Sequence, residues 1–399
     1  MRNPLADKVV DIKPSGIRKF FDIVSEMQDA ISLGVGEPDF DTPWHIRDEG
    51  IYSLEKGRTF YTSNAGLKDL RQEICNTIQR KQGVTYDWQH EVLVTVGGSE
   101  AIDIGLRAMC NPGDEVLIPQ PSYVSYEPCA VLAGATPVII DLKAENEFRL
   151  TAEELEAAIT DKTKVLILPF PNNPTGAIME KSDLEAIAKV IEEHDIFVMS
   201  DEIYSELTYK EKHVSIVSLP GMKERTIYIN GFSKAYAMTG WRIGYLAAPA
   251  DVAKACSKLQ GQTTSGTCSV AQKAAEAAYT TSQECVAEML EAFRRRRDLI
   301  VGLCRAIPGM KLEEPQGAFY IFPEVSAFIG RSYTAADGSR KTIADDNDLA
   351  MYLLEEAHVA TVAGSAFCLP GYIRLSYAAA DDQLVEAMDR IAKALARLS

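Results

Sequence analysis

The 399-residue sequence lacks several features that mark membrane, secreted or metal-binding proteins. It has no run of about 20 apolar residues, the length that a membrane-spanning helix needs. Its first residues, MRNPLADKVVDIKP, have no apolar core of a signal peptide. The eight cysteines form no CxxC pair, and the five histidines have no ligand spacing. These absences indicate a soluble cytoplasmic protein with reduced cysteines, and they argue against a structural zinc site.

Positively charged residues are also outnumbered by negatively charged ones. The chain has 41 lysines and arginines against 57 aspartates and glutamates, so its net charge is −16. Nucleic acids and anionic membranes are therefore poor candidate partners. An anionic small molecule would have to be held by local arginines, because the field of the whole chain opposes its binding.

Short apolar runs alternate with helix-like stretches over most of the chain, which predicts an α/β fold. Continuous apolar strands between helices are typical of a mostly parallel sheet that is sandwiched by helices. The seven predicted strands are at 92–96, 115–119, 137–141, 165–170, 196–201, 226–230 and 244–248.

Three regions are predicted from this pattern. Residues 1–43 form an N-terminal arm that joins the small domain and contains a helix at 15–27. Residues 44–280 form the large domain with the seven-stranded sheet. Residues 281–399 form a smaller α+β domain, in which the polar stretch 330–348 is predicted to be a surface loop.

The stretch 226–245, TIYINGFSKAYAMTGWRIGY, carries the most informative side chains. A predicted strand breaks at Gly231 and is followed by Ser233, Lys234 and then Arg242. A Ser-Lys pair most often means a solvated lysine in an ordinary loop. Here, however, an amine at a strand end lies near a hydroxyl and an arginine. This set suits covalent capture of a phosphorylated aldehyde, with a Schiff base at the amine and the phosphate on the other two groups.

Polar groups also follow the other predicted strands, at the end of the sheet where ligands bind in such folds. GGSEA (97–101) provides free amides at a helix N-terminus, but it lacks the third glycine of a dinucleotide fingerprint. Asp201 ends a buried run and needs a partner, such as a protonated ring nitrogen. Taken alone, Tyr123 fits an ordinary packing tyrosine and Asn173 fits an ordinary turn. Together these groups fit pyridoxal phosphate.

These motifs resemble those of the fold type I, class I/II pyridoxal-phosphate aminotransferases. The aspartate/aromatic subgroup is the most similar, and SGIRKF and DEIYSELTY resemble N-acetyl-diaminopimelate and aromatic aminotransferases. The resemblance implies transfer of an amino group from an L-amino acid to a 2-oxo acid, with 2-oxoglutarate expected, by a ping-pong mechanism. It extends over nearly the whole chain, through GEPDFDTP (36–43), YTSNAG (61–66), GGSEA (97–101), PSYVSY (121–126), PNNPTG (171–176), SDEIYSEL (200–207), SKAYAMTGWRIGY (233–245), GAFYIF (317–322) and YIRLSYA (372–378).

The resemblance implies a role at the cofactor ring for each matching residue. Lys234 would bind the cofactor as a Schiff base and later carry a proton. Asp201 would pair with the ring nitrogen and keep it protonated. Tyr204 and Asn173 would hydrogen-bond the ring oxygen, and Tyr123 would stack on the ring.

Further roles concern the phosphate, the substrate and a second subunit. Tyr61 would contact the phosphate in the partner subunit, which implies a homodimer with shared active sites. Arg374 would bind the substrate carboxylate, helped by an amide near Gly36 and by Asn173. The phosphate itself would be held by Gly98, Ser99, Glu100, Ser233 and Arg242.

The sequence departs from the family pattern at 258–269, KLQGQTTSGTCS. Dicarboxylate-specific relatives take a second arginine from the partner subunit in this region, and here there is none. Aspartate, aromatic residues and N-acetyl-diaminopimelate therefore stay open as donors. We hypothesise that Arg18 in the N-terminal arm recognises a distal carboxylate or acyl group.

Three other functions agree with parts of the sequence but less well with the whole. A carbon–sulfur β-lyase of the same fold is the chemical alternative, but the sequence around Lys234 is more similar to a transaminase. A cofactor-sensing regulator would need a DNA-binding domain, and only about 40 residues precede the large domain of this acidic chain. A nicotinamide dehydrogenase would leave the lysine unexplained.

Overall fold

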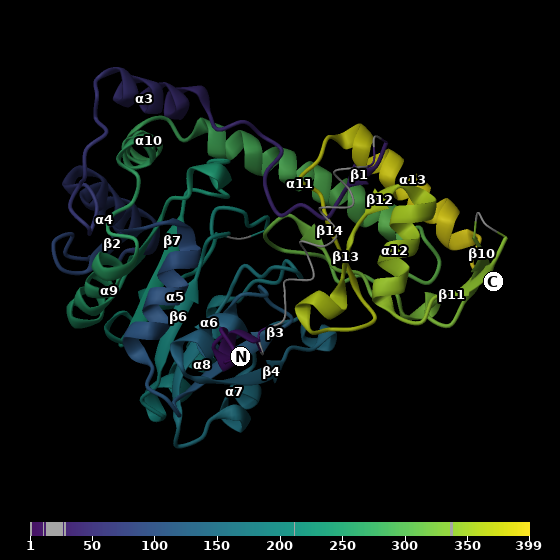
Figure 1. Ribbon diagram of the computed structural model, residues 1–399, viewed down its shortest axis with the longest axis horizontal. Coiled ribbons are helices and arrows are strands. Elements are labelled where there is room, and N and C mark those ends of the chain that lie inside the picture. The colour runs from purple at the N-terminus through teal and green to yellow at the C-terminus, as the bar shows by residue number, and fades with distance from the viewer. Residues whose placement is uncertain (1, 11, 13–26, 28, 211, 336–337) are drawn as a thin grey trace.

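The computed structural model describes residues 2–10, 12, 27, 29–210, 212–335 and 338–399. A large sheet with its helices fills one part of the molecule, and the C-terminal helices with smaller sheets fill the other (Figure 1). The helix predicted at 15–27 and Arg18 lie outside the described residues, except for Met27. In the described part of the chain, no helix is both long and apolar enough to cross a bilayer.

The large sheet has seven strands in the order β2-β8-β7-β6-β5-β3-β4. Only β8 runs antiparallel to its neighbours β2 and β7, and the other pairs are parallel. The predicted mostly parallel seven-stranded sheet is confirmed. Every residue of β2, β7 and β8 is buried, which explains their continuous apolar runs. The strands are β2 (Val92–Thr95), β3 (Glu115–Gln120), β4 (Thr136–Asp141), β5 (Thr163–Leu168), β6 (Phe197–Asp201), β7 (Thr226–Gly231) and β8 (Gly244–Ala247).

Helices bury apolar side chains against both faces of this sheet, in two separate core clusters. One face packs against α4 (Lys68–Gln82), α7 (Ala152–Ala158), α8 (Lys181–Glu193) and α10 (Ser269–Thr280), and the other against α5 (Gly97–Met109), α6 (Tyr126–Ala133) and α9 (Ala250–Thr263). The short α1 (Asp7–Val10) contacts α6, and α3 (Trp44–Glu55) packs on α10.

The C-terminal part has its own core, formed by three helices and a three-stranded sheet of order β13-β14-β9. Near the start of the chain, β1 (Ile31–Ser32) pairs in parallel with β12 (Val359–Ala360). Segment 31–34 is therefore held by the C-terminal part of the protein. The remaining elements are α11 (Glu284–Arg305), α12 (Asp346–Ala357), α13 (Asp381–Ala396), β9 (Tyr320–Ile321), β13 (Val362–Ala363) and β14 (Ile373–Ser376).

The stretch 330–348 is not the plain loop that the sequence predicted. Strands β10 (Ser332–Thr334) and β11 (Arg340–Thr342) pair as an antiparallel hairpin. All three residues of β11 are exposed, so the strand has no apolar face that a hydrophobic pattern could reveal. Helix α12 then begins at Asp346, where the Asp345 side chain accepts a hydrogen bond from the Asp348 amide at 2.9 Å.

Candidate active site

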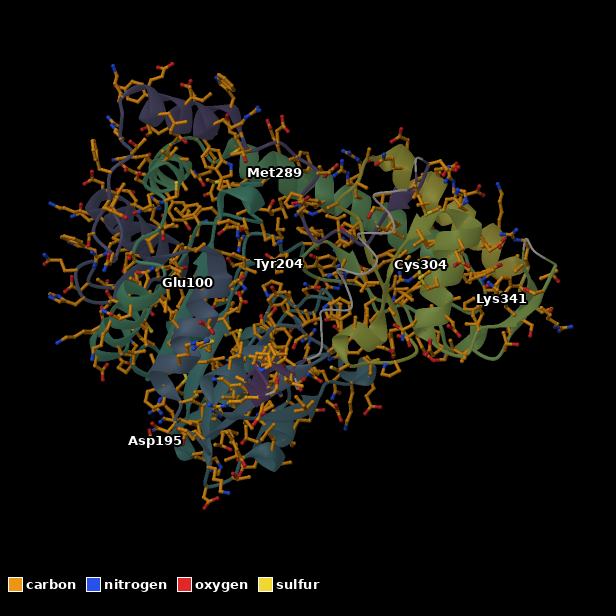
Figure 2. The ribbon with its side chains drawn as sticks, in the orientation of Figure 1. Glu100, Asp195, Tyr204, Met289, Cys304 and Lys341 are labelled. Carbon is orange, nitrogen blue, oxygen red and sulfur yellow. The ribbon has the colours of Figure 1, made fainter. Side chains whose placement is uncertain are left out.

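The carboxyl ends of the parallel strands open onto a cavity of about 530 Å³. Loops after β3, β5, β6 and β7 and the first turn of α5 form one wall, and segment 35–37, β9 and β14 form the other. Tyr204 lies where the two parts of the molecule meet (Figure 2). The predicted site residues that line the cavity are Gly36, Gly98, Ser99, Tyr123, Asn173, Asp201, Tyr204, Ser233, Lys234, Arg242 and Arg374.

Lys234 follows β7 and is held inside the cavity. Its Nζ donates a hydrogen bond to the carbonyl oxygen of Gly36 at 2.5 Å and lies 5.6 Å from the centre of the Tyr204 ring. Burial, together with the nearby Arg374 cation, lowers the pKa of Lys234 to about 8. A much larger fraction of this amine is therefore uncharged at neutral pH than of a solvated lysine, and only the uncharged form is a nucleophile or a base.

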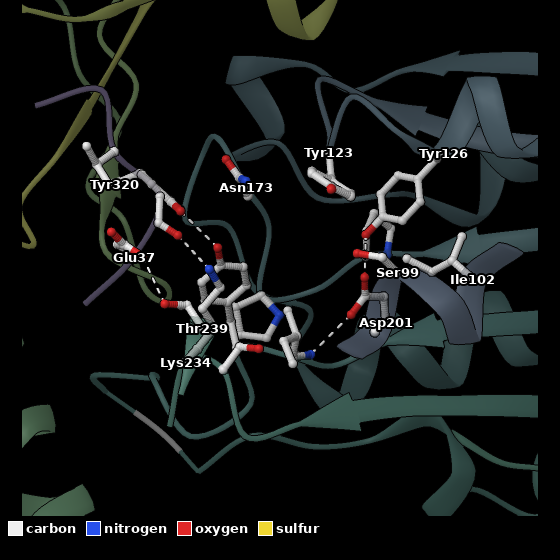
Figure 3. A pocket seen from close by; sticks show the side chains of 18 of the residues that line it. Glu37, Ser99, Ile102, Tyr123, Tyr126, Asn173, Asp201, Lys234, Thr239 and Tyr320 are labelled. Carbon is white, nitrogen blue, oxygen red and sulfur yellow. Dashed lines mark hydrogen bonds between the residues drawn. The ribbon is translucent and has the colours of Figure 1, made fainter. Parts of the chain in front are cut away.

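Asp201 ends β6 as a buried carboxylate. The groups that donate to it are uncharged, namely the Tyr126 hydroxyl at 2.7 Å and the Ile203 amide at 3.2 Å (Figure 3). Burial raises the pKa of Asp201, and these two hydrogen bonds oppose that effect. A cationic N–H group in the cavity would favour the ionised carboxylate.

Arg374 lies on β14 and is only 2% exposed. It donates to Asn173 Oδ1 at 2.8 Å and to the Gly34 carbonyl oxygen at 2.6 Å, and both acceptors are uncharged. Its buried Nε has no hydrogen-bond partner among the described residues. The guanidinium carbon lies 4.4 Å from the centre of the Tyr320 ring. Burial lowers the pKa of Arg374, and among the residues that the structure describes the groups that accept its hydrogen bonds carry no charge to compensate its desolvation.

A second cationic group meets the first turn of α5. Gly97 has a φ of +71°, and a Cβ atom there would lie 2.8 Å from Nη2 of Arg242. The glycine therefore lets the guanidinium reach the helix N-terminus, where Gly98 and Ser99 line the cavity. Arg242 Nη1 also donates to the Thr239 carbonyl oxygen at 3.1 Å. An arginine beside the amides of a helix N-terminus is suited to bind a phosphate.

Two predicted residues do not line the cavity. The Glu100 side chain accepts hydrogen bonds from the Val96 amide at 2.6 Å and from Gln260 at 3.2 Å, so it caps the start of α5. Only its backbone could take part in the phosphate contact that was predicted. The Tyr61 side chain is 99% exposed.

The sequence pattern missed several residues that the structure places at the cavity. Tyr126 is the last residue of the PSYVSY motif. The one clue to its role was that a buried Asp201 needs a hydrogen-bond donor, and the Tyr126 hydroxyl is that donor. Glu37 accepts a hydrogen bond from Thr239 at 2.8 Å and so joins segment 35–37 to the Arg242 loop (Figure 3). Tyr320, from the GAFYIF motif, has its hydroxyl oxygen 2.9 Å from that of Tyr204. A pairing across two chain segments leaves no trace in the local sequence.

Comparisons with known proteins give one consistent result. A family model for aminotransferases of class I and II matches residues 28–391. The aspartate aminotransferase of Pyrococcus abyssi is 43% identical over 98% of both chains. The probable N-acetyl-LL-diaminopimelate aminotransferase of Bacillus subtilis is 41% identical over 98% of this chain and 95% of that protein. A crystal structure of the aspartate aminotransferase from Rhizobium meliloti superposes with a TM-score of 0.94 at 39% identity, covering 100% of each chain.

Proposed function

Because this chain belongs to the class I and II aminotransferases, we propose that its cavity binds pyridoxal phosphate and that the enzyme works by a ping-pong mechanism. The predictions of the family, of the fold type I architecture and of amino-group transfer are confirmed by the similarities above. They do not favour a β-lyase. The cofactor, the residue roles and the substrates given below are our proposal.

The observation that carries the proposal is the meeting of three groups in one cavity. Lys234 offers a partly uncharged amine, Asp201 offers a buried carboxylate with uncharged donors, and Arg242 lies beside the N-terminus of α5. These groups match the aldehyde, the ring nitrogen and the phosphate of pyridoxal phosphate. The cofactor, when bound, supplies an electron sink for the bond electrons of the substrate Cα atom.

On the sheet side, each residue would hold one part of the ring. Asp201 would keep a proton at the ring nitrogen through a charge-assisted hydrogen bond. Asn173 accepts from Arg374 through Oδ1, which leaves its Nδ2 group to donate to the ring oxygen. Tyr204 would donate to the same oxygen, and Tyr123 would cover the ring face. The amine of Lys234 would move the proton at the substrate Cα atom.

On the opposite wall, Arg374 would bind the α-carboxylate of the amino acid. No described residue accepts a hydrogen bond from its Nε, and its contacts to Asn173 and Gly34 hold the guanidinium plane in place. A carboxylate would compensate the buried cation through two parallel hydrogen bonds. The amide near Gly36 would add a third donor.

We also propose a cytoplasmic homodimer in which Tyr61 contacts the phosphate of the partner subunit. Exposed apolar side chains support such an interface: Tyr61 is 99% exposed, Phe60 82% and Trp44 62%. The hypothesis that Arg18 recognises the distal part of the substrate concerns a residue outside the described ones. If Arg18→Ala left the kinetics on acidic and neutral amino acids equally unchanged, that hypothesis would be wrong.

The proposed function is tested by a screen of amino donors with 2-oxoglutarate as the acceptor. The absorbance of the bound cofactor should change when a donor is added and return when the 2-oxo acid follows. Release of pyruvate and ammonia without an acceptor would instead support the β-lyase. Covalent attachment of the cofactor to a Lys234→Ala variant would contradict the whole assignment.

A further inference from the structure

Tyr320 lies at the cavity in a position that none of the roles above explains. Its hydroxyl oxygen is 2.9 Å from that of Tyr204, and both side chains are buried. Tyr320 is on β9, where it pairs with Ser376 of β14, the strand that also carries Arg374. A Cβ atom at Gly36 would lie 2.9 Å from the Tyr320 hydroxyl, so the glycine leaves room for it.

The direction of the Tyr320–Tyr204 hydrogen bond follows from counting hydrogens. A tyrosine hydroxyl has one hydrogen to donate and lone pairs with which to accept. If Tyr204 donates its hydrogen to the ring oxygen of the cofactor, it can only accept from Tyr320. In that state Tyr320 is the donor and Tyr204 the acceptor. The pair then forms a chain of two hydrogen bonds that ends at the ring oxygen.

Arg374 strengthens this chain from its far end. The guanidinium carbon lies 4.4 Å from the centre of the Tyr320 ring. Burial raises the pKa of Tyr320, while the Arg374 cation acts in the opposite direction and makes the hydroxyl a better donor. Hydrogen bonds in series polarise one another, so a better donor at Tyr320 makes Tyr204 a better donor in turn.

We infer that Tyr320 is a positioning residue whose hydroxyl donates to Tyr204 and thereby orients and strengthens the hydrogen bond from Tyr204 to the ring oxygen of the cofactor. This inference rests on the proposed function. It links the arginine that binds the substrate to the cofactor ring by a route separate from Asn173. Arg374 on β14, Asp201 on β6 and Tyr123 after β3 act electrostatically on the two hydroxyls. The amine of Lys234 lies 5.6 Å from the centre of the Tyr204 ring, and Glu37 in turn acts on Lys234.

The test is a pH titration of the absorbance of the Lys234-bound cofactor in the holoenzyme. A hydrogen bond to the ring oxygen stabilises its negative charge and disfavours protonation of the link to Lys234. The Tyr320→Phe variant should therefore raise the titration midpoint by about 0.5, and Tyr204→Phe should raise it by about 1. Tyr320→Phe should also weaken binding of pyridoxal phosphate to the cofactor-free enzyme by about threefold.

A matched control is available in the same part of the molecule. Tyr377 is fully buried, and its hydroxyl donates to that of Tyr209 at 3.1 Å, but neither lines the cavity. Tyr377→Phe removes the hydrogen bond of an equivalent tyrosine pair away from the cavity and should leave the titration midpoint unchanged. An equal shift in Tyr377→Phe would overturn the inference, because the effect would then be one of general packing.

The double variant separates the inference from the proposed function. Once Tyr204→Phe has removed the middle of the chain, adding Tyr320→Phe should change the midpoint no further. If Tyr204→Phe shifts the midpoint and Tyr320→Phe does not, the inference fails and the proposed function stands. If neither substitution shifts the midpoint, the proposed role of Tyr204 fails, and the inference fails with it. If the midpoint shifts of the two single variants added up in the double variant, Tyr320 would act independently of Tyr204, and the inference would also fail.

Discussion

The two walls of the cavity are built in different ways. The sheet wall takes its side chains from the ends of strands that follow one another along the chain, from Gly98 to Arg242. The opposite wall combines segment 35–37 with residues 320 and 374, which come together through the pairing of β1 with β12 and of β9 with β14. The residues of the first wall are therefore brought together by the ends of neighbouring strands, and those of the second by contacts between segments far apart in the chain.

The two walls also differ in the charged side chain that each buries. The sheet wall buries the carboxyl group of Asp201, whereas the opposite wall buries the cation of Arg374. Lys234 lies between them, and Arg374 contributes to the lowering of its pKa to about 8. The wall that would bind the substrate therefore also tunes the amine that would bind the cofactor.

The largest expected effect is on the sheet wall, from Lys234→Ala. Loss of the amine removes both the covalent bond to the cofactor and the proton carrier, so kcat should fall by about 10⁴-fold or more. Steady-state kinetics and cofactor absorbance measure the two losses. Lys254→Ala, which changes an exposed lysine on α9, is the control and should keep full activity. An active Lys234→Ala enzyme would refute the assignment.

On the opposite wall, Arg374→Met should raise KM for the amino donor by about 100-fold, because a charge-assisted pair worth about 3 kcal/mol is lost. Binding of the cofactor should change little. Arg297→Met is the matched control, since Arg297 is also buried and lies 4.8 Å from the centre of the Tyr209 ring. If both variants raised KM equally, Arg374 would have no special role in substrate binding.

A smaller effect is expected at the phosphate end, from Gly97→Ala. The residue has a φ of +71°, which costs a residue with a side chain about 1–2 kcal/mol, and the new methyl group would displace Arg242. Affinity for pyridoxal phosphate should fall about 20-fold by fluorescence titration. Gly113→Ala, at a φ of +97° with open space around it, should lower stability without changing that affinity.

The smallest effect links the two walls through pH. Only the uncharged amine of Lys234 attacks the aldehyde, and its pKa is about 8. The rate at which cofactor-free enzyme captures pyridoxal phosphate should therefore rise about tenfold between pH 7 and pH 9 and then level off. In Arg374→Met the neighbouring cation is gone, so the pKa of Lys234 rises and the profile moves to higher pH. An unmoved profile would mean that the two walls are electrostatically independent.

The difference between the walls also explains which site residues could be predicted from the local sequence and which could not. Asp201, Asn173 and Lys234 follow apolar runs, and parallel strands bring such positions to one edge of a sheet. Their convergence on one cavity could therefore be predicted from their positions after successive strands along the chain. Arg374 and Gly36 were identified only through family motifs, because nothing in their local sequence shows that β1 meets β12.

Other features lay beyond any local pattern. The partner of Asp201 is Tyr126, 75 residues away in the chain, and its role depends on which strands are neighbours in the sheet. The Glu100 side chain was predicted only as one of the groups that hold the phosphate, and its hydrogen bond from the Val96 amide shows that it caps the start of α5 instead. The hairpin of β10 and β11 was missed because its residues alternate too weakly between apolar and polar.

The pairing of β1 with β12 has a consequence for the order in which the protein is completed on the ribosome. All seven strands of the large sheet have been made once Ala247 has emerged. Ile31, although made early, pairs with Val359, which is made near the end. The cofactor side can thus form during synthesis, whereas the substrate side has to wait for nearly the whole chain.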